Sequence, residues 1–242
     1  MAKNKKALGS FDIMQSLFNF KDMYVTATYN SKNEKTGDCV QVSFIPVDMY
    51  KDGKIDYEKS ETVCPSSCIF FQLKSCYVNL AYSVGSIVKA VRNNRYTTGL
   101  DFTKLRGRII RIGAYGDCSS LPYEYIEKIT KVASGFMNYT HGWRECDQRF
   151  KNIAMASCES IDDVLDAQSK GWRTFRVIMP CESLLENETL CPNSKNSNIT
   201  CNMCLKCNGS NGKSKQNIVV VRHGLSHKLK SFDTYFSNSI ID

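Results

Sequence analysis

The sequence of 242 residues lacks the features that mark several large classes of protein. No run approaches the roughly 18 consecutive apolar residues that a membrane-spanning helix needs, and no segment repeats at a fixed period. Only 3 histidines are present, with no HxxxH or HxH pair. A metal-assisted hydrolase or transferase built on His141, His223 or Asp117 is therefore the least favoured class of enzyme.

The N-terminus begins with a basic segment but lacks the rest of a secretory signal. Asp12 and Gln15 interrupt its apolar stretch, and no small-residue cleavage site follows. We therefore expect a cytoplasmic protein. Disulfides are rare in that compartment, where clustered cysteines are more often metal ligands or reactive centres.

The composition is that of a globular protein. Hydrophobic residues make up 42% of the chain and charged residues 23%, which excludes disordered, collagen-like and coiled-coil proteins. The length predicts one large domain, or one domain with an appendage. The 32 basic and 24 acidic side chains give a net charge of +8. This charge is compatible with a nucleic-acid or nucleotide partner, although charge alone indicates only non-specific association.

Alternating strand and helix patterns predict an α/β fold. Segments rich in β-branched and aromatic residues predict strands at 23–29, 39–47, 108–116, 136–140, 153–157, 174–179 and 217–223. Helical periodicity and capping residues predict helices at 80–94, 122–134, 144–151 and 160–171. The first two strands would form a β-hairpin, and the later alternation is typical of βαβ units with a parallel sheet.

The length of the chain limits the architecture further. A closed eight-fold barrel typically needs about 250 residues, so we expect a partial (β/α) barrel or an open, mostly parallel sheet. The sequence divides into an N-terminal β-hairpin extension (1–60), an α/β core (61–180), and a four-cysteine loop with the final strand and tail (181–242). All three would belong to one compact domain.

The strongest local motif is a set of four cysteines near the C-terminus. Cys191-x9-Cys201-x2-Cys204-x2-Cys207 lies in a loop of Asn, Ser, Gly and Lys that could not form a hydrophobic core. Four thiolates suit tetrahedral zinc or one [4Fe-4S] cluster equally well. The spacing predicts a metal site and leaves the metal open.

A second group of cysteines has the spacing Cys64-x3-Cys68-x7-Cys76. Three thiolates suit a second [4Fe-4S] cluster with one open iron, or a metal with an open position. Three buried, unligated cysteines are an equal alternative, because free cysteine is buried readily. The others have no ligand-like spacing and are expected to pack in the interior: Cys39, Cys118, Cys146, Cys158 and Cys181. Cys118 and Cys158 also lie at the ends of predicted parallel strands, where ligands bind, so a place at that edge stays open for them.

The segments that follow the predicted strands would converge on one edge of the sheet, where ligands bind in open α/β folds. Gly113, Tyr115, Gly116 and Asp117 follow one strand and are candidate cofactor-binding residues. His141 and Arg144 follow the next and are the candidate catalytic residues, although their roles stay open. Trp143 could stack on a base or belong to the core.

Several of these motifs, taken in order, resemble a family of largely uncharacterised, cysteine-rich bacteriophage proteins. The resemblance covers about residues 60–224 and rests on CPSSC…SCY (64–77), IRIGAYGD…PYE (110–124), YTHGWR (139–144), MASCES (155–160), GWRTFRV (171–177) and CPNSK…CNMCLKCNG (191–209). It implies a phage origin and a location in the host-cell cytoplasm, but no particular activity.

The chain is also distantly similar to radical S-adenosylmethionine enzymes. The resemblance implies a partial barrel in which Cys64, Cys68 and Cys76 hold a [4Fe-4S] cluster. Residues 113–117 would occupy the place of the family's Gly-Gly-Glu motif, with Asp117 near the ammonium group of S-adenosylmethionine. The four C-terminal cysteines would hold an auxiliary cluster. The spacing C-x3-C-x7-C differs from the family's C-x3-C-x2-C, so the type of cluster stays open.

Two functional hypotheses follow. The first is a phage-encoded iron–sulfur protein that resembles radical S-adenosylmethionine enzymes and acts on a nucleotide or nucleic acid. The alternative is a zinc-stabilised, non-enzymatic phage protein that binds nucleic acid or a host protein. The alternative is motivated by lysines close to the four-cysteine motif: Lys195, Lys206, Lys213 and Lys215. Neither predicts a membrane partner, and the oligomeric state stays open.

Overall fold

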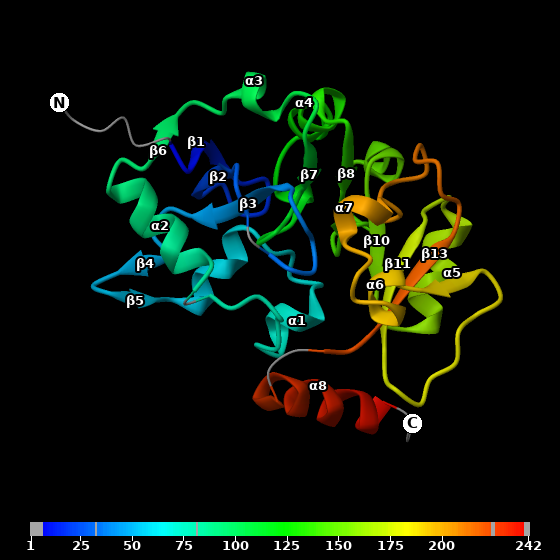
Figure 1. The fold of residues 1–242 in the computed structure, drawn as a ribbon. Helices are drawn as coiled ribbons and strands as arrows, with labels where there is room; N and C mark the ends of the chain where they lie inside the picture. The colour runs from blue at the N-terminus through cyan, green and yellow to red at the C-terminus, as the bar shows by residue number, and fades with distance from the viewer. Residues whose placement is uncertain (1–6, 32, 81, 224–225, 240–242) are drawn as a thin grey trace.

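A computed structural model of the chain describes residues 7–31, 33–80, 82–223 and 226–239. Its strands form two main sheets (Figure 1). The first has the order β6-β1-β2-β3-β7-β8, with β1 (Gly9–Gln15), β2 (Asp22–Thr28), β3 (Val40–Pro46), β6 (Tyr96–Thr98), β7 (Ile109–Arg111) and β8 (Gly135–Met137). The second has the order β12-β13-β11-β10-β9, with β9 (Tyr139–Thr140), β10 (Met155–Cys158), β11 (Thr174–Ile178), β12 (Glu188–Leu190) and β13 (Asn217–Val221).

The expected N-terminal hairpin is confirmed and belongs to a larger sheet. β2 pairs antiparallel with β3, and β1 pairs antiparallel with β2. β3 is buried along its whole length because it also pairs, in parallel, with β7. The N-terminal strands therefore continue the sheet of the α/β core.

Two βαβ units form the centre of the molecule, as the alternating pattern predicted. In the first, β7 leads through α4 (Tyr123–Val132) to β8, parallel to β7. In the second, β10 leads through α5 (Ile161–Ser169) to β11, parallel to β10. Ser160 caps α5: its side chain accepts from the backbone N–H of Asp163, whose carboxylate accepts from the backbone N–H of Ser160.

The two sheets meet at Asn138, the single residue between β8 and β9. The backbone N–H of Asn138 donates to the carbonyl of Cys207 at 2.8 Å, and its carbonyl accepts from the N–H of Met155 at 3.1 Å. β9 to β13 are parallel, so a run of parallel strands extends from β3 to β12. Within the described part of the chain the run does not close into a barrel, which is compatible with an open α/β fold.

The sequence patterns missed several elements. β1 was not predicted, and the charged stretch after β3 contains β4 (Tyr50–Lys51), β5 (Lys54–Ile55) and the 3-10 helix η1 (Tyr57–Thr62). The helix predicted at 144–151 is the 3-10 helix η3 (Gln148–Asn152), and that at 80–94 is α2 (Val84–Arg92). The remaining helices are α1 (Ile69–Gln72), α3 (Phe102–Leu105), η2 (Cys118–Ser120), α6 (Pro192–Lys195), α7 (Cys201–Cys204) and α8 (Ser226–Ser239). Most are single turns, too short for a periodic pattern.

One large hydrophobic core unites the N-terminal strands with the βαβ units, extending from Met23 in β2 to Trp172 before β11. A much smaller cluster lies under the second sheet, with Met155, Cys191, Ile218 and Val220 as its buried members. Within the described ranges, no helix has the length and apolarity to cross a membrane.

Candidate functional site

A cavity of about 300 Å³ lies between the first cysteine segment, the strand ends and the four-cysteine loop. Both groups of cysteines selected from their spacing line it: Cys64, Cys68, Cys76, Cys191, Cys201, Cys204 and Cys207. Residues 137 positions apart in the sequence at Cys64 and Cys201 thus contribute to one site. The cavity also takes in Gly113, Tyr115, Gly116, Asp117 and His141 from the strand-end segments.

Short turns position Cys64, Cys68 and Cys76, which together form the first cysteine wall of the cavity. The backbone N–H of Cys64 donates to the carbonyl of Ser60 at 2.8 Å, which ties it to η1. Cys68 is the N-cap residue of α1, and the N–H of Cys76 donates to the carbonyl of Phe70 at 3.1 Å. Burial raises the pKa of the Cys64 thiol well above its usual value, and Cys68 and Cys76 raise it further. The three thiols are therefore electrostatic neighbours.

Backbone contacts position Cys191, Cys201, Cys204 and Cys207, which together form the second cysteine wall. The N–H of Cys191 donates to Val219 of β13 at 2.8 Å, and that of Cys201 to Lys35 in the β2–β3 loop at 3.0 Å. Leu205 ends α7 in the left-handed conformation, with φ of 51°. Burial raises the pKa of Cys207, followed by the effects of Cys191, Cys201 and Cys204, so these four thiols also form one electrostatic group.

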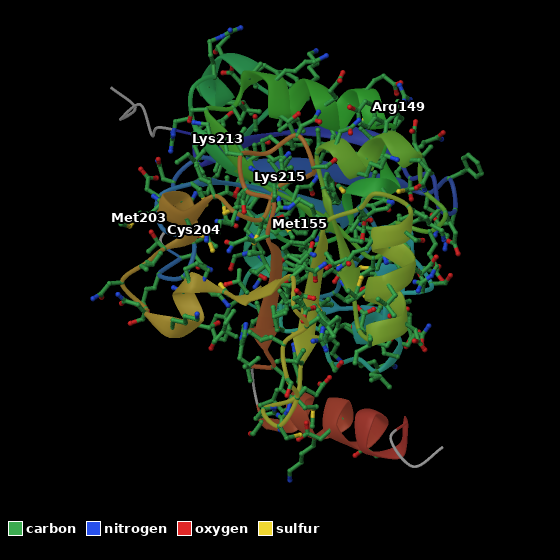
Figure 2. All side chains as sticks on the ribbon, turned by 90° about the vertical axis from the view of Figure 1, so that its right-hand side faces the viewer. Arg149, Met155, Met203, Cys204, Lys213 and Lys215 are labelled. Atoms are coloured by element: carbon green, nitrogen blue, oxygen red, sulfur yellow. The ribbon has the colours of Figure 1, made fainter. Side chains whose placement is uncertain are left out.

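Arg173 holds the polar loop that follows this wall. Its buried guanidinium donates to the carbonyl of Lys206 at 2.9 Å, that of Asn208 at 2.6 Å and that of Gly209 at 3.3 Å, and also to the carbonyl of Gln216. Figure 2 shows this loop, which carries Lys213 and Lys215, above α7 with Cys204. Hydrogen bonds from one arginine, rather than apolar contacts, thus hold a segment that has few apolar residues.

The two groups of cysteines fit a metal or cluster by their chemistry. Thiolates are the preferred ligands of zinc and of iron–sulfur clusters, and the members of each group line the same wall. Within the described residues, no group of three or more His, Cys, Asp or Glu side chains is arranged to hold a metal ion. The thiols would therefore have to turn toward a common point to bind one.

The glycine-containing loop after β7 runs beside β3. Gly113 and Gly116 have φ of 69° and 78°, which only glycine adopts readily. A Cβ on Gly116 would also lie 2.8 Å from the carbonyl oxygen of Phe44. Tyr115 is 4% exposed, and its hydroxyl forms a 2.6 Å hydrogen bond with that of Ser60. Tyr115 therefore joins the loop to η1 beside the first cysteine wall.

Asp117 is the hydrogen-bonding centre of the strand ends. One carboxylate oxygen accepts from the hydroxyl of Thr140 at 2.6 Å and from the N–H and hydroxyl of Ser119 at 2.9 and 2.8 Å. The other accepts from the backbone N–H of His141 at 2.7 Å. Four donors already surround this buried carboxylate, so it fixes the segment after β9 against the segment after β7.

His141 connects the first cysteine wall to Glu159. Its Nδ1 lies 2.9 Å from a carboxylate oxygen of Glu159, and its ring packs edge-on against Phe70 with centroids 5.7 Å apart. Burial lowers the pKa of His141, but the Cys68 sulfur and Glu159 outweigh this effect and raise the pKa well above its usual value. Glu159 directly follows Cys158 at the end of β10; it lies in one of the segments expected at the strand ends but was not among the candidate site residues.

The other candidate catalytic residue, Arg144, does not line the cavity. Its guanidinium lies 3.9 Å from the ring centroid of Trp143 and pairs with Asp163 and, at 3.7 Å, with Asp166 on α5. Trp143 is fully buried and donates its indole N–H to the carbonyl of Ser157 at 3.1 Å. The structure therefore places Trp143 in the core and Arg144 on the outer side of the sheet.

The remaining cysteines lie outside the residues that line the cavity. Cys39, Cys118 and Cys158 are buried and Cys146 is partly buried, as expected for packing residues. Cys181 was also expected to pack in the interior, but it is exposed, because it lies in the loop between β11 and β12.

A cationic cluster that the sequence patterns did not reveal lies in the same cavity. The guanidinium of Arg111, at the end of β7, donates to the hydroxyl of Tyr77 at 2.5 Å and to that of Tyr139 at 3.4 Å. The ammonium of Lys35 lies 2.9 Å from Nε2 of His223. These residues come from five separate segments, so spacing could not have identified them.

Comparisons of the chain with protein-family models, with curated proteins and with solved structures found no match.

Proposed function

We propose that the chain is a metal-dependent enzyme of iron–sulfur type, with the cavity as its substrate site. One observation carries this proposal: two cysteine groups, chosen separately for their metal-like spacing, line the same cavity. Structural zinc sites have four closed ligands and contribute to folding, whereas catalytic metal sites keep an open position. Two thiol-rich walls facing one cavity are better explained by chemistry carried out between them.

Cys64, Cys68 and Cys76 would hold a [4Fe-4S] cluster with an open iron, and the other four cysteines would hold a second cluster. When bound, such a cluster supplies an electron for the reductive cleavage of S-adenosylmethionine, the chemistry of the enzymes that the chain resembles. The resemblance also supports a phage origin and the host-cell cytoplasm as the place of action.

The surrounding residues would orient a substrate and exclude water. The loop of Gly113 and Gly116 brings backbone close to the cavity without side chains in the way. Asp117 fixes the backbone of His141. His141, held by Glu159 on one side, is placed to hold a proton beside the Cys68 sulfur.

A second candidate function is a zinc-stabilised binding protein without catalysis. It is favoured by the exposed Lys213 and Lys215, which lie on the loop beside the four-cysteine wall (Figure 2). The positive charges of these lysines would attract the phosphates of a nucleic acid.

Element analysis of anaerobically purified protein, before and after incubation with iron and sulfide, tests the proposal. We expect iron and sulfide in the protein, with charge-transfer absorbance near 400 nm. Cys68→Ala and Cys204→Ala should each remove about half of the iron, because each breaks one of two separate sites. Cys181→Ala, at the exposed cysteine outside the cavity, should remove none.

Zinc alone in anaerobic protein, with no iron uptake, would support the binding protein instead. Iron that survives both Cys68→Ala and Cys204→Ala would overturn the proposed sites.

A further inference from the structure

The cavity is lined by many more lysine and arginine side chains than carboxylates. Five cationic side chains are part of the lining: Lys35, Arg111, Lys206, Arg222 and Lys228. Among the described lining residues, Asp117 is the single carboxylate, and its oxygens already accept four hydrogen bonds. The carboxylates of the lining therefore do not neutralise its lysines and arginines.

All of these cations except Arg222 have only neutral partners among the described residues. Lys206 donates to the side-chain oxygen of Gln216 at 2.8 Å, and the other three are Lys228, Lys35 and Arg111. Arg222 pairs with Asp233 of α8 at 2.8 Å, whereas the ammonium of Lys228 donates to the backbone carbonyls of Cys76 and, at 2.9 Å, Val78. Lys35 contacts His223, whose pKa is lowered by burial and by Lys35 itself. His223 is thus neutral at pH 7 and accepts from Lys35.

Of these four cations, Arg111 lies beside two tyrosine hydroxyl groups. Tyr77 and Tyr139 share its guanidinium and also contact each other, with 2.9 Å between their hydroxyl oxygens. A phenol is neutral at pH 7, so Tyr77 gives Arg111 no counter-charge. Phe175 stacks on Tyr139 at a centroid distance of 4.8 Å and an interplanar angle of 8°, which fixes that ring.

An arginine flanked by two hydroxyl groups is a typical receptor for an oxyanion. The planar guanidinium stays protonated at every accessible pH and binds two oxygens side by side. Phenol hydroxyls donate to further oxygens. Tyr77 also keeps 44% of its surface accessible, and this surface borders the cavity. The cluster is therefore reachable by a ligand.

We propose that the cavity binds a small phosphate monoester, with its phosphate at Arg111, Tyr77 and Tyr139 and its second charge balanced by Lys35 and Lys228. A phosphate monoester carries about two negative charges at pH 7, which suits several unneutralised cations better than a single carboxylate does. Ligand pockets span roughly 300–1,000 Å³, so a cavity of about 300 Å³ suits one small molecule rather than a polymer. This inference rests on the proposed function in that it names the substrate class of the same cavity.

Calorimetric titration of the full chain with adenosine 5′-monophosphate tests the inference, with adenosine and succinate as matched probes. We expect the monophosphate to bind at least tenfold more tightly than adenosine, a difference of about 1.4 kcal/mol. Binding should weaken as salt increases. Succinate is a dianion without phosphorus, so equally tight binding of succinate would overturn the phosphate assignment. No binding of the monophosphate at millimolar concentration would overturn the inference altogether.

Variants locate the binding site. Arg111→Gln should weaken monophosphate binding at least tenfold, and Tyr77→Phe, which removes one hydroxyl, should weaken it by a smaller factor. Arg106→Gln is the matched control, because Arg106 is exposed and lies outside the cavity lining. Unchanged binding by folded Arg111→Gln would refute the site. If circular dichroism shows that Arg111→Gln is unfolded, unchanged binding by Tyr77→Phe refutes it instead.

The two proposals fail in different ways. Iron content reports on the cysteine walls and does not depend on Arg111, whereas phosphate affinity reports on the cationic cluster. Protein that takes up iron but binds no monophosphate would leave the proposed function standing and remove this inference. Monophosphate binding without metal uptake would do the reverse.

Discussion

The two sheets of this protein are stabilised in different ways. In the first sheet, β3 is buried at every position, and its apolar side chains belong to the large core. In the second, β11 alternates between buried and partly exposed positions, and one of its buried side chains is the charged Arg176. The large core also includes Ala156 and Cys158 of β10, but the separate apolar cluster of this sheet, with Met155, Ile218 and Val220, is far smaller.

The second sheet adds a network of buried hydrogen bonds to its apolar contacts. Arg176 forms two bonds to Glu188 of β12, at 2.9 and 2.6 Å, and both side chains are almost fully buried. Arg173, at the start of the same strand, holds the loop that carries Lys206 and Gln216. Such networks impose one defined geometry but tolerate little change, because each unpaired buried group is costly. This rigidity suits the sheet that supports four of the cavity's cysteines.

Phe44→Ala tests the first half of this comparison and should have the largest effect. Phe44 lies in β3 and is fully buried. Removing its ring leaves a cavity in the main core, so we expect a loss of about 3–5 kcal/mol in the free energy of unfolding. Denaturant unfolding followed by circular dichroism measures the loss. Phe20→Ala is the control: Phe20 is 73% exposed, and its replacement should cost at most about 0.5 kcal/mol.

Glu188→Ala tests the second half and should cost slightly less, about 3–4 kcal/mol, because it leaves the buried guanidinium of Arg176 without its main counter-charge. Glu182, which lies 3.2 Å from Arg176 and is 31% exposed, provides the matched comparison. Glu182→Ala should cost about 1 kcal/mol or less, since water can replace a half-exposed carboxylate.

The double variant Arg176→Met/Glu188→Leu completes this test by denaturant unfolding. If the pair mainly sets geometry, the double variant should recover most of the stability that Glu188→Ala loses. A double variant no more stable than Glu188→Ala would show instead that the ion pair is itself a major source of stability, and the contrast between the sheets would be smaller than we infer.

The same contrast explains which elements the sequence could predict. The β2–β3 hairpin and the two βαβ units follow from apolar periodicity and capping residues, and all are confirmed. β12 was missed because Glu188 and Thr189 carry no apolar pattern; Glu188 is buried only because Arg176 pairs with it. β1 was missed because its burial depends on its pairing with β2 and β6.

The residues of the site likewise divide into those that the sequence could predict and those that it could not. Cysteine spacing found both walls because ligand spacing is local, and the glycines before Asp117 marked a strand end. The cluster of Arg111, Tyr77 and Tyr139 could not be found from the sequence. Its members become neighbours only when β7, β9 and the first cysteine segment meet, and no spacing rule links the separate motifs in which they stand.

Ser160→Ala tests a capping contact at the start of one helix and should have the smallest effect of these variants. The Ser160 hydroxyl caps α5 by accepting from the N–H of Asp163, and this interaction was readable from the sequence alone. Removing an N-cap typically costs about 1 kcal/mol, measurable by denaturant unfolding. Ser160→Thr keeps the cap and should restore most of that loss. A loss near 3 kcal/mol would mean that the cap also supports the neighbouring His141–Glu159 pair, because Asp163 accepts from the N–H of Glu159 as well.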